Sequence, residues 1–269
     1  MSALVSLLVV GAVVGLCELC RGAMSQLSSG VSPGVSPVYQ EALWELVCTL
    51  QLCWCALEMQ LLGASSELQL CASVSLLYGL TLLHLRSFRG ASCSVLGPLE
   101  RLWRGALRPP QALVLVGAQV SGAVLAQVLS VQLWSQGWSQ VHVRHQRSGF
   151  QCSSAVRGSV LQAAATELFC CACIQVLVLQ LHRLPPALRL HALSAGITAM
   201  VLTGGAVSGA VMNPVLALAL QFPCSGLSYL DFLLVYCLGP VLGVLSANLL
   251  LPSLCGRSPV TMETQKKTQ

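Results

Sequence analysis

The stretch Gly204-Gly-Ala-Val-Ser-Gly-Ala-Val-Met-Asn213-Pro214-Val215-Leu-Ala-Leu-Ala-Leu220 decides how the chain is interpreted. A run of small residues leads into Asn213-Pro214, and a short apolar segment with helical periodicity follows. Asparagine is a strong N-cap, and proline suits the first helical position because its missing N–H would go unpaired there. The helix after it is too short to cross a bilayer. Membrane channels use capped half-helices to direct a helix N-terminus toward a pore, and an ordinary helix start inside a membrane bundle fits the stretch equally well.

The composition is that of an integral membrane protein. Of 269 residues, 55% are hydrophobic and only 9% are charged, whereas a soluble protein carries roughly a quarter charged residues. The mean hydropathy is +0.76. The net charge of +5 is small, and no basic patch is interleaved with aromatic residues, so the sequence gives no sign of a nucleic-acid partner.

The sequence shows no catalytic machinery and no metal site. The 14 Cys residues are scattered, mostly in apolar segments, and form no paired CxxC pattern. His142 and His145 could share a metal, but solvated loop histidines are commoner. Glu58 stands near a predicted helix end, where its side chain can reach the membrane interface. There is no phosphate-binding glycine loop, nucleophile elbow or pair of catalytic carboxylates, so we predict neither an enzyme nor a cofactor.

The N-terminal region, residues 1–40, stands apart from the rest. Its apolar stretch from residue 3 is followed by Glu18 and Arg21, and it lacks the basic n-region of a signal peptide. Residues 3–20 predict either a short extra span or a helix on the membrane surface. Residues 22–40 are rich in Ser, Gly and Pro and predict a loop.

Six longer apolar segments follow, each near the ~20 residues that a spanning helix needs. They are 41–62, 70–85, 112–133, 159–181, 188–207 and 230–251. Together they predict a channel domain over 41–255, followed by a polar tail over 256–269.

The two halves of this domain, repeat one at 41–133 and repeat two at 159–251, resemble each other. Glu45, Ser94 and Gln119 match Glu167, Asn213 and Pro240 in the same order, at offsets of 122, 119 and 121 residues. With three spans in each half, the two copies must have opposite orientations in the membrane, which makes this an inverted repeat. Such repeats are typical of channels and transporters.

Glu45 and Glu167 are carboxyl groups deep in apolar helices, where each needs a partner. They could carry protons. Their equivalent positions in the repeat favour a structural role, in which each accepts hydrogen bonds from the backbone of the re-entrant loop in its own half.

Lysine and arginine set the orientation, because cytoplasmic loops carry more of both. If residue 41 starts on the cytoplasmic side, ten are cytoplasmic: Arg86, Arg89, Arg101, Arg104, Arg108, Arg183, Arg189, Arg257, Lys266 and Lys267. Three lie on the other side: Arg144, Arg147 and Arg157. Arg21 joins the cytoplasmic group if residues 3–20 span. The tail is therefore predicted to be cytoplasmic, and the Asn213 half-helix enters from the lumenal or extracellular face.

Inverted three-helix repeats with a helical glutamate and an Asn-Pro-Ala half-helix resemble the aquaporin family. The segments Gln119–Gly122 and Pro240–Gly243 are similar to that family's third and sixth spans. Asn213-Pro214-Val215 corresponds to the second of the family's two Asn-Pro-Ala motifs, here called boxes. Gly204-Gly205 and Cys224, on either side of it, resemble the superaquaporin branch, and its subgroup eleven more than its subgroup twelve. So do residues 51–62 and 141–143. The resemblance covers about residues 41–255 and implies an all-α membrane protein, with three spanning helices and one re-entrant half-helix in each half.

The chain departs from the family pattern at both boxes. Ser94-Val95-Leu96 stands where the first Asn-Pro-Ala box is expected. Serine can cap a helix but brings no amide N–H to a permeating molecule, and Val95 lacks the preset φ of proline. In the second box, the alanine position holds Val215. The arginine of the family's selectivity filter is replaced by Leu216, and its histidine position corresponds to Val201.

The resemblance implies a passive channel for water and small neutral solutes, with glycerol and hydrogen peroxide as candidates. It also implies membrane lipid as the surroundings and a homo-oligomer, a tetramer in this family. The rival hypothesis is a non-conducting membrane protein with a structural or partner-binding role, which the altered first box motivates.

The family branch is largely intracellular, and the chain ends Lys266-Lys267-Thr-Gln, a spacing that resembles the dilysine retrieval signal. We therefore predict residence in the endoplasmic reticulum membrane, with the plasma membrane as the alternative. Cys224 follows the second half-helix and is expected on the non-cytoplasmic side. Whether it is free or paired with Cys152 is open at this stage.

Overall fold

Helices form the regular structure of the described chain. The computed structural model describes residues 2–30, 37–65, 68–181, 183–222 and 224–254, and within these ranges no strand occurs beyond one isolated bridge between Ser153 and Ser225. The helices are α1 (Ser2–Gly30), α2 (Pro37–Gly63), α3 (Leu70–Ser87), α4 (Leu96–Trp103), α5 (Pro109–Trp134), α6 (Gln140–Arg147), α7 (Val160–Leu181), α8 (Pro186–Ser208), α9 (Pro214–Leu220), α10 (Tyr229–Phe232), the π-helix η1 (Leu233–Leu238) and α11 (Gly239–Leu254). The predicted all-α fold is confirmed.

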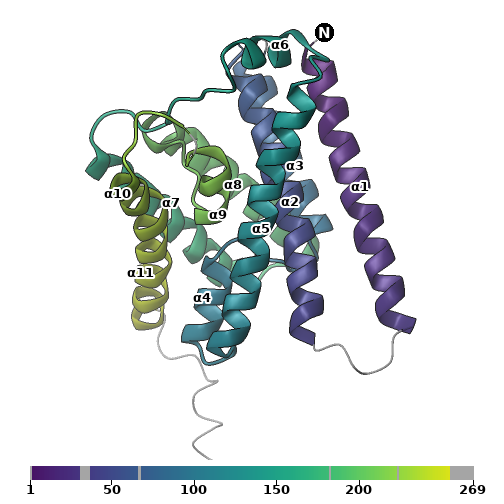
Figure 1. The fold of residues 1–269 in the computed structure, drawn as a ribbon. Helices are drawn as coiled ribbons and strands as arrows, with labels where there is room; N and C mark the ends of the chain where they lie inside the picture. The colour runs from purple at the N-terminus through teal and green to yellow at the C-terminus, as the bar shows by residue number, and fades with distance from the viewer. Residues whose placement is uncertain (1, 31–36, 66–67, 182, 223, 255–269) are drawn as a thin grey trace, which may run out of the picture.

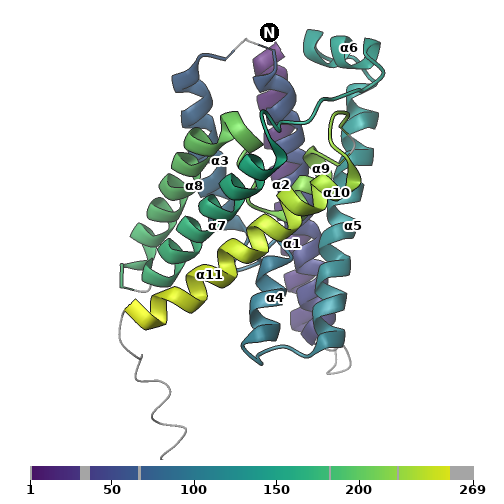
Figure 2. The same ribbon diagram turned by 90° about the vertical axis from the view of Figure 1, so that its left-hand side faces the viewer.

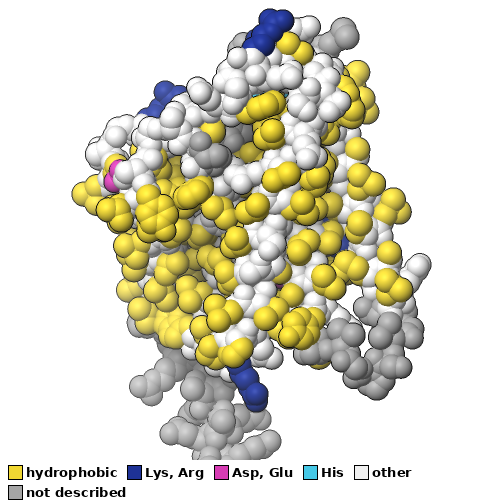
Figure 3. Space-filling view, viewed as in Figure 1, with side chains coloured by type: hydrophobic (Ala, Val, Ile, Leu, Met, Phe, Trp, Pro, Cys, Tyr) yellow, Lys and Arg dark blue, Asp and Glu magenta, His cyan; other side chains and the backbone are white. Residues whose placement is uncertain are grey.

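Seven stretches of the described helices are long and apolar enough to cross a membrane. They are α1, α2, α3, α5, α7, α8 and the continuous segment Tyr229–Leu250, which joins α10, η1 and α11. The face shown in Figure 3 has hydrophobic side chains over its middle and basic side chains at its two ends, as a membrane-embedded surface requires.

The two halves lie side by side with opposite orientations. In the first half α2 packs along α5, in the second α7 packs along α11, and α3 meets α8 between them. The half-helices α4 and α9 lie in opposite halves of the molecule in both ribbon views (Figures 1 and 2). Each half thus contributes three long helices and one short helix, the architecture that the repeat predicts.

Close helix crossings hold each half together, and glycine makes them possible. A Cβ atom on Gly122 of α5 would lie 2.7 Å from the carbonyl oxygen of Leu46 in α2. On Gly243 of α11 it would lie 2.3 Å from the carbonyl oxygen of Leu168 in α7. The two contacts are equivalent in the repeat, so the pattern Gln119–Gly122 and Pro240–Gly243 marks the crossing point of two helices in both halves.

The last span contains a π-helical turn next to a proline. Pro240 is buried and has no N–H to donate to the carbonyl four residues earlier. The π turn η1 ends at Leu238, two residues before Pro240, and a π turn next to a proline is a common way for a helix to absorb such a missing hydrogen bond.

The prediction of a loop over residues 22–40 is wrong for the part of this range that the structure describes, which is helical. Helix α1 continues past Arg21 to Gly30, and α2 begins at Pro37, a favourable first helical residue. The side chain of Arg21 is buried against α2 and so continues the packed face beyond the apolar stretch. Most side chains of residues 22–27 are exposed, so burial does not explain the rest of the helix; Ala23, Met24, Gln26 and Leu27 are good helix formers, and the Ser and Gly content concealed this local preference. By length and composition, α1 can span a membrane.

Candidate functional site

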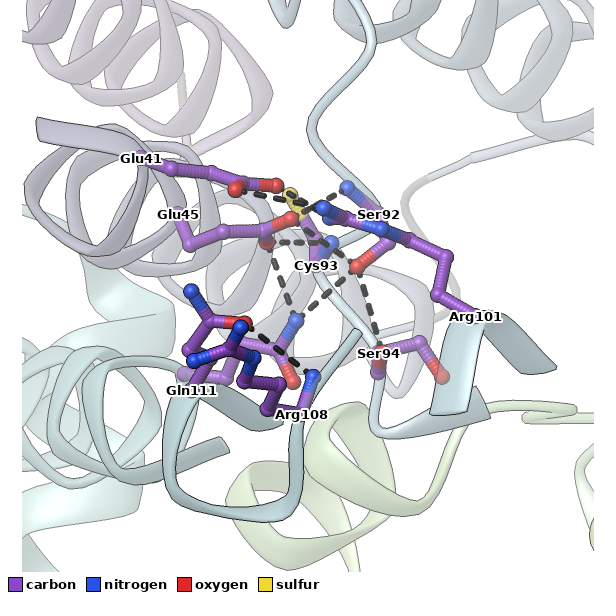
Figure 4. A network of polar contacts seen from close by, with 9 residues as sticks. Glu41, Glu45, Ser92, Cys93, Ser94, Arg101, Arg108 and Gln111 are labelled. Carbon is purple, nitrogen blue, oxygen red and sulfur yellow. Dashed lines mark hydrogen bonds and ion pairs between the residues drawn. The ribbon is translucent and has the colours of Figure 1, made fainter. Parts of the chain in front are cut away.

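The carboxylate of Glu45 organises the first re-entrant loop (Figure 4). Its Oε1 accepts hydrogen bonds from the backbone N–H of Ser92 at 2.8 Å and from the Ser92 hydroxyl at 2.9 Å. Its Oε2 accepts from the backbone N–H of Cys93 at 2.9 Å and from Nε2 of Gln119 at 3.0 Å. Glu45 is only 3% exposed, so these four donors replace the water that its charge loses on burial.

Glu167 does the same in the second half. Its Oε1 accepts from the Ser208 hydroxyl at 2.7 Å and from the backbone N–H of Val211 at 3.0 Å, and its Oε2 accepts from the backbone N–H of Met212 at 2.6 Å. In both halves the glutamate thus accepts from two successive backbone N–H groups of its re-entrant loop, together with side-chain donors. Pro240, the counterpart of Gln119, has no side-chain donor, and the Ser208 hydroxyl supplies the additional bond in this half.

Both loops have left-handed backbone at matching positions. Gly90 and Gly209 have φ of +96° and +86°, and the glutamate-bound residues Cys93 and Met212 have φ of +49° and +55°. A non-glycine residue in this region costs about 1 kcal/mol or more. The sharp turn brings two successive N–H groups to one carboxylate, and these charge-assisted hydrogen bonds offset the strain.

Asn213 joins the two halves at the start of α9. Its Oδ1 accepts from the backbone N–H groups of Val215 and Leu216 at 3.0 and 3.3 Å, so it is the N-cap, with Pro214 at the first helical position. Its Nδ2 donates to the carbonyl oxygen of Cys93 in the first loop at 2.8 Å. An amide has two N–H groups, and this bond uses one of them.

The start of α4 is built differently. Ser94 is 9% exposed, and its hydroxyl accepts from the backbone N–H of Leu96 at a long 3.4 Å. The N-cap position falls on Val95, which already has helical backbone (φ −57°) and offers no side-chain cap. Val95 thus adopts the φ that proline would impose, but α4 lacks the firm side-chain cap that Asn213 gives α9.

Apolar side chains surround the meeting point of the half-helices. Val215 is 2% exposed and belongs to a cluster with Cys53 and Ala123, against which Val95 and Leu216 also pack. The structure therefore brings together the variable positions of both boxes. Val201 lies half-buried on α8. It belongs to none of the hydrophobic clusters of the described residues, including the cluster that holds Val215.

Polar contacts tether α4 to neighbouring helices at the end from which it enters. Arg101 of α4 forms an ion pair with Glu41 of α2 (Figure 4). On its other side Glu100 accepts from Nε2 of Gln175 in α7 at 2.9 Å, and Arg104 donates to Oδ1 of Asn248 in α11 at 3.0 Å. The first half-helix is thus fixed to both repeats.

At the opposite end lies a buried polar cluster that sequence reasoning missed. Glu58 is completely buried, not at the membrane interface, because its Oε1 contacts Nε2 of His142 at 2.9 Å and its Oε2 accepts from Nε1 of Trp134 at 2.7 Å. His142 is completely buried in α6 and is not the solvated loop residue expected. Residues 51–62 and 141–143 each stood out separately in the sequence, but nothing local pairs them.

His145, also in α6, packs edge-on against Trp134 and Phe150. Burial, together with the neighbouring His142, lowers the pKa of His145 below its usual range.

A disulfide anchors the second half-helix at the same end of the molecule. Cys152 and Cys224 are bonded, with their Cα atoms 4.6 Å apart, which resolves the alternative left open for Cys224. The backbone N–H of Ala155 also donates to Oε1 of Gln221 at 2.9 Å, so the loop before α7 is fixed to the C-terminal end of α9.

A shallow open groove of about 400 Å³ lies between α3 and α8, lined mainly by apolar side chains and by Tyr78 and Thr198. Tyr78 contacts Nδ1 of His191 at 2.6 Å. Within the described ranges, no three His, Cys, Asp or Glu residues are grouped so as to hold a metal ion.

Comparisons with known proteins agree with this geometry. Residues 99–251 match the family model described as major intrinsic protein, a match that begins after the altered first box. The chain is 34% identical to human aquaporin-11 (Homo sapiens) over 78% of this chain and 76% of that protein. It is 32% identical to mouse aquaporin-12 (Mus musculus) over 91% of this chain and 84% of that protein. Its fold matches the Plasmodium falciparum aquaglyceroporin with a TM-score of 0.63 at 16% identity, covering 81% of this chain and 97% of that one.

The chain therefore belongs to the major intrinsic protein family, the aquaporins, and these are multi-pass membrane channels for water or small solutes. The branch that the sequence indicated, the superaquaporins resembling aquaporin-11 more than aquaporin-12, is confirmed.

Proposed function

We propose that the protein is a passive channel for water and small neutral solutes, with glycerol and hydrogen peroxide as candidate solutes. The observation that carries the proposal is the meeting of the two re-entrant loops, where Asn213 of one donates to the Cys93 carbonyl of the other at 2.8 Å. Two half-helices that enter from opposite ends and meet in this way form the central element of an inverted-repeat channel.

No covalent chemistry is needed for this activity. The second N–H of Asn213 offers a hydrogen bond to the oxygen of a passing solute. The N-terminus of α9 carries partial positive charge and opposes cations and proton hopping. Leu216, in place of a filter cation, together with Val95 and Val201, gives a more apolar constriction. We expect slow water flux and relaxed size selection as a result.

The rival, a non-conducting protein with a structural or partner-binding role, is favoured by the first box. Ser94 has no amide, and Val95 and Leu216 pack against one apolar cluster. Osmotic swelling of proteoliposomes that contain the purified protein separates the two hypotheses. A channel swells them faster than protein-free vesicles do, with water, glycerol or hydrogen peroxide as permeant. Equal rates for all three permeants would favour the rival.

We propose residence in the endoplasmic reticulum. Lys266 and Lys267 lie outside the described residues, so this part rests on sequence. The Cys152–Cys224 disulfide fits an oxidising lumen. A double Lys266→Ser, Lys267→Ser variant should expose more protein to surface biotinylation. Wild-type protein found mostly at the plasma membrane would contradict this location.

We also propose a homo-oligomer, a tetramer as in the family. Crosslinking in native membranes should give a ladder that ends at four subunits, and a monomer alone would contradict it.

A further inference from the structure

Two thiols lie side by side behind the first re-entrant loop. Cys48 of α2 and Cys93 of the loop are both free and almost completely buried, at 0% and 1% exposure, and their side chains are in contact. They come from elements 45 residues apart in the chain. Their contact is therefore a product of the fold and not of local sequence.

A buried arginine stands beside one of these thiols. Nη1 of Arg21 in α1 lies 3.6 Å from Sγ of Cys48, while Nη2 donates to Oε1 of Gln51 at 2.7 Å. The Arg21 side chain is 2% exposed, and its ion pair with Glu18 at 3.0 Å is its carboxylate contact. Its Nε has no partner within the described residues. A guanidinium in this position favours negative charge on the neighbouring sulfur and makes it a better nucleophile.

The second half provides an internal comparison. Cys170 follows Glu167 by three residues, as Cys48 follows Glu45. The loop position equivalent to Cys93 is Met212, whose thioether cannot form a disulfide. Both cysteines have a glutamate one turn earlier, so the difference between them is the Arg21 guanidinium, which lies 3.6 Å from the sulfur of Cys48. Two thiols thus lie together at the first re-entrant loop, and α1, which lies outside the repeat, supplies the cation beside them.

Cys93 also connects the thiol pair to the channel. Its N–H donates to Glu45, its carbonyl accepts from Asn213, and it holds a left-handed backbone conformation. A covalent change at its sulfur therefore acts on a strained residue that is hydrogen-bonded to Glu45 and to Asn213 at the start of α9.

We propose that Cys48 and Cys93 form a redox modification site, which a hydroperoxide such as hydrogen peroxide converts into a disulfide. The Cys48 thiolate attacks one peroxide oxygen, the O–O bond breaks, and Cys48 becomes a sulfenic acid as hydroxide leaves and takes up a proton. The Cys93 sulfur then attacks the Cys48 sulfur. The S–O bond breaks, and the departing oxygen leaves as water with the Cys93 proton. Two thiols lose two electrons, and one peroxide becomes two waters.

The bond shortens the sulfur–sulfur contact to about 2.05 Å. It pulls Cys93 toward α2 and alters the Cys93–Asn213 contact. Its effect on solute flux rests on the proposed channel function, but the modification itself does not.

The test exposes the full-length protein in liposomes to hydrogen peroxide, blocks the remaining thiols with N-ethylmaleimide, and maps unreduced peptides by mass spectrometry. We expect a peptide that links Cys48 to Cys93, reversed by dithiothreitol, with the Cys152–Cys224 peptide as an internal positive control. Cys170→Ser should leave the linkage unchanged. Absence of the 48–93 link while the control peptide is found, or pairing of Cys48 with another cysteine, overturns the proposal.

Two further variants separate the chemistry from folding. Cys93→Met copies the second half and should stop the reaction at a Cys48 sulfenic acid, which dimedone traps, whereas Cys170 stays unlabelled. Arg21→Met should slow the oxidation by about tenfold or more, and Arg21→Lys, which keeps the charge, should retain most of the rate. Equal dimedone labelling of Cys170, or an unchanged rate in a folded Arg21→Met protein, contradicts the assigned role of the arginine. If vesicles never swell but the link forms, the channel function fails and this site stands.

Discussion

Replacing Asn213 by alanine removes three hydrogen bonds that hold the start of α9 and tie it to the first loop. The loss of the helix cap costs about 1 kcal/mol. The loss of the donor to the Cys93 carbonyl costs about 1 kcal/mol more. In contrast, Ser94→Ala removes one long contact of 3.4 Å to the Leu96 N–H, and we expect a cost below about 0.5 kcal/mol.

These costs predict different thermal midpoints for the purified protein. A loss of about 2 kcal/mol lowers the midpoint of a chain of this size by roughly 4–8 °C, and Ser94→Ala should leave it nearly unchanged. Stopped-flow swelling of proteoliposomes gives the second readout, in which Asn213→Ala should reduce solute flux far more than Ser94→Ala.

The Asn213→Asp variant separates capping from donation. Its carboxylate still accepts from the N–H groups of Val215 and Leu216 but cannot donate to a solute or to Cys93. We expect flux as low as in the alanine variant and a smaller loss of stability. If Ser94→Ala lowers flux and midpoint as much as Asn213→Ala does, the asymmetry between the two half-helix starts is not functional.

Gly243→Ala should destabilise the protein by about 1–3 kcal/mol, because its Cβ would meet the α7 backbone at 2.3 Å. Gly117→Ala, with open space in the interior of α5, should be stabilising by up to about 1 kcal/mol in the same melting assay. Cys224→Ser should cost about 4 kcal/mol, since the bridge closes a separation of 72 residues. In wild-type protein, an impermeant maleimide should label Cys224 only after reduction and only from the non-cytoplasmic face, and cytoplasmic labelling would invert the topology. Because the pKa of His145 is lowered in the folded protein, the folded state binds fewer protons than the unfolded state does. The stability of the folded state is therefore lost as the pH falls below about 6.5. Hydrogen exchange in α6 should then rise, and His145→Gln should abolish that pH dependence.

Several features were predictable from sequence because they depend on local pattern or on its repetition. The apolar segments of about 20 residues specify spanning helices in any fold. The pairs Glu45 and Glu167, Ser94 and Asn213, and Gln119 and Pro240 recur at nearly constant offsets, which specifies the inverted repeat. Asn213-Pro214 specifies a helix start by cap chemistry alone, and α9 begins there.

Tertiary structure decided the contacts that join distant residues. The Cys152–Cys224 bridge spans 72 residues, and Glu58 reaches His142 across 84. Arg21 is buried beside Cys48, a contact between helices α1 and α2 that its position after the apolar stretch does not indicate. No periodicity or composition encodes such pairs, because a polar side chain near a helix end looks the same in sequence whether water or a distant partner satisfies it. Which one does so depends on how the helices pack.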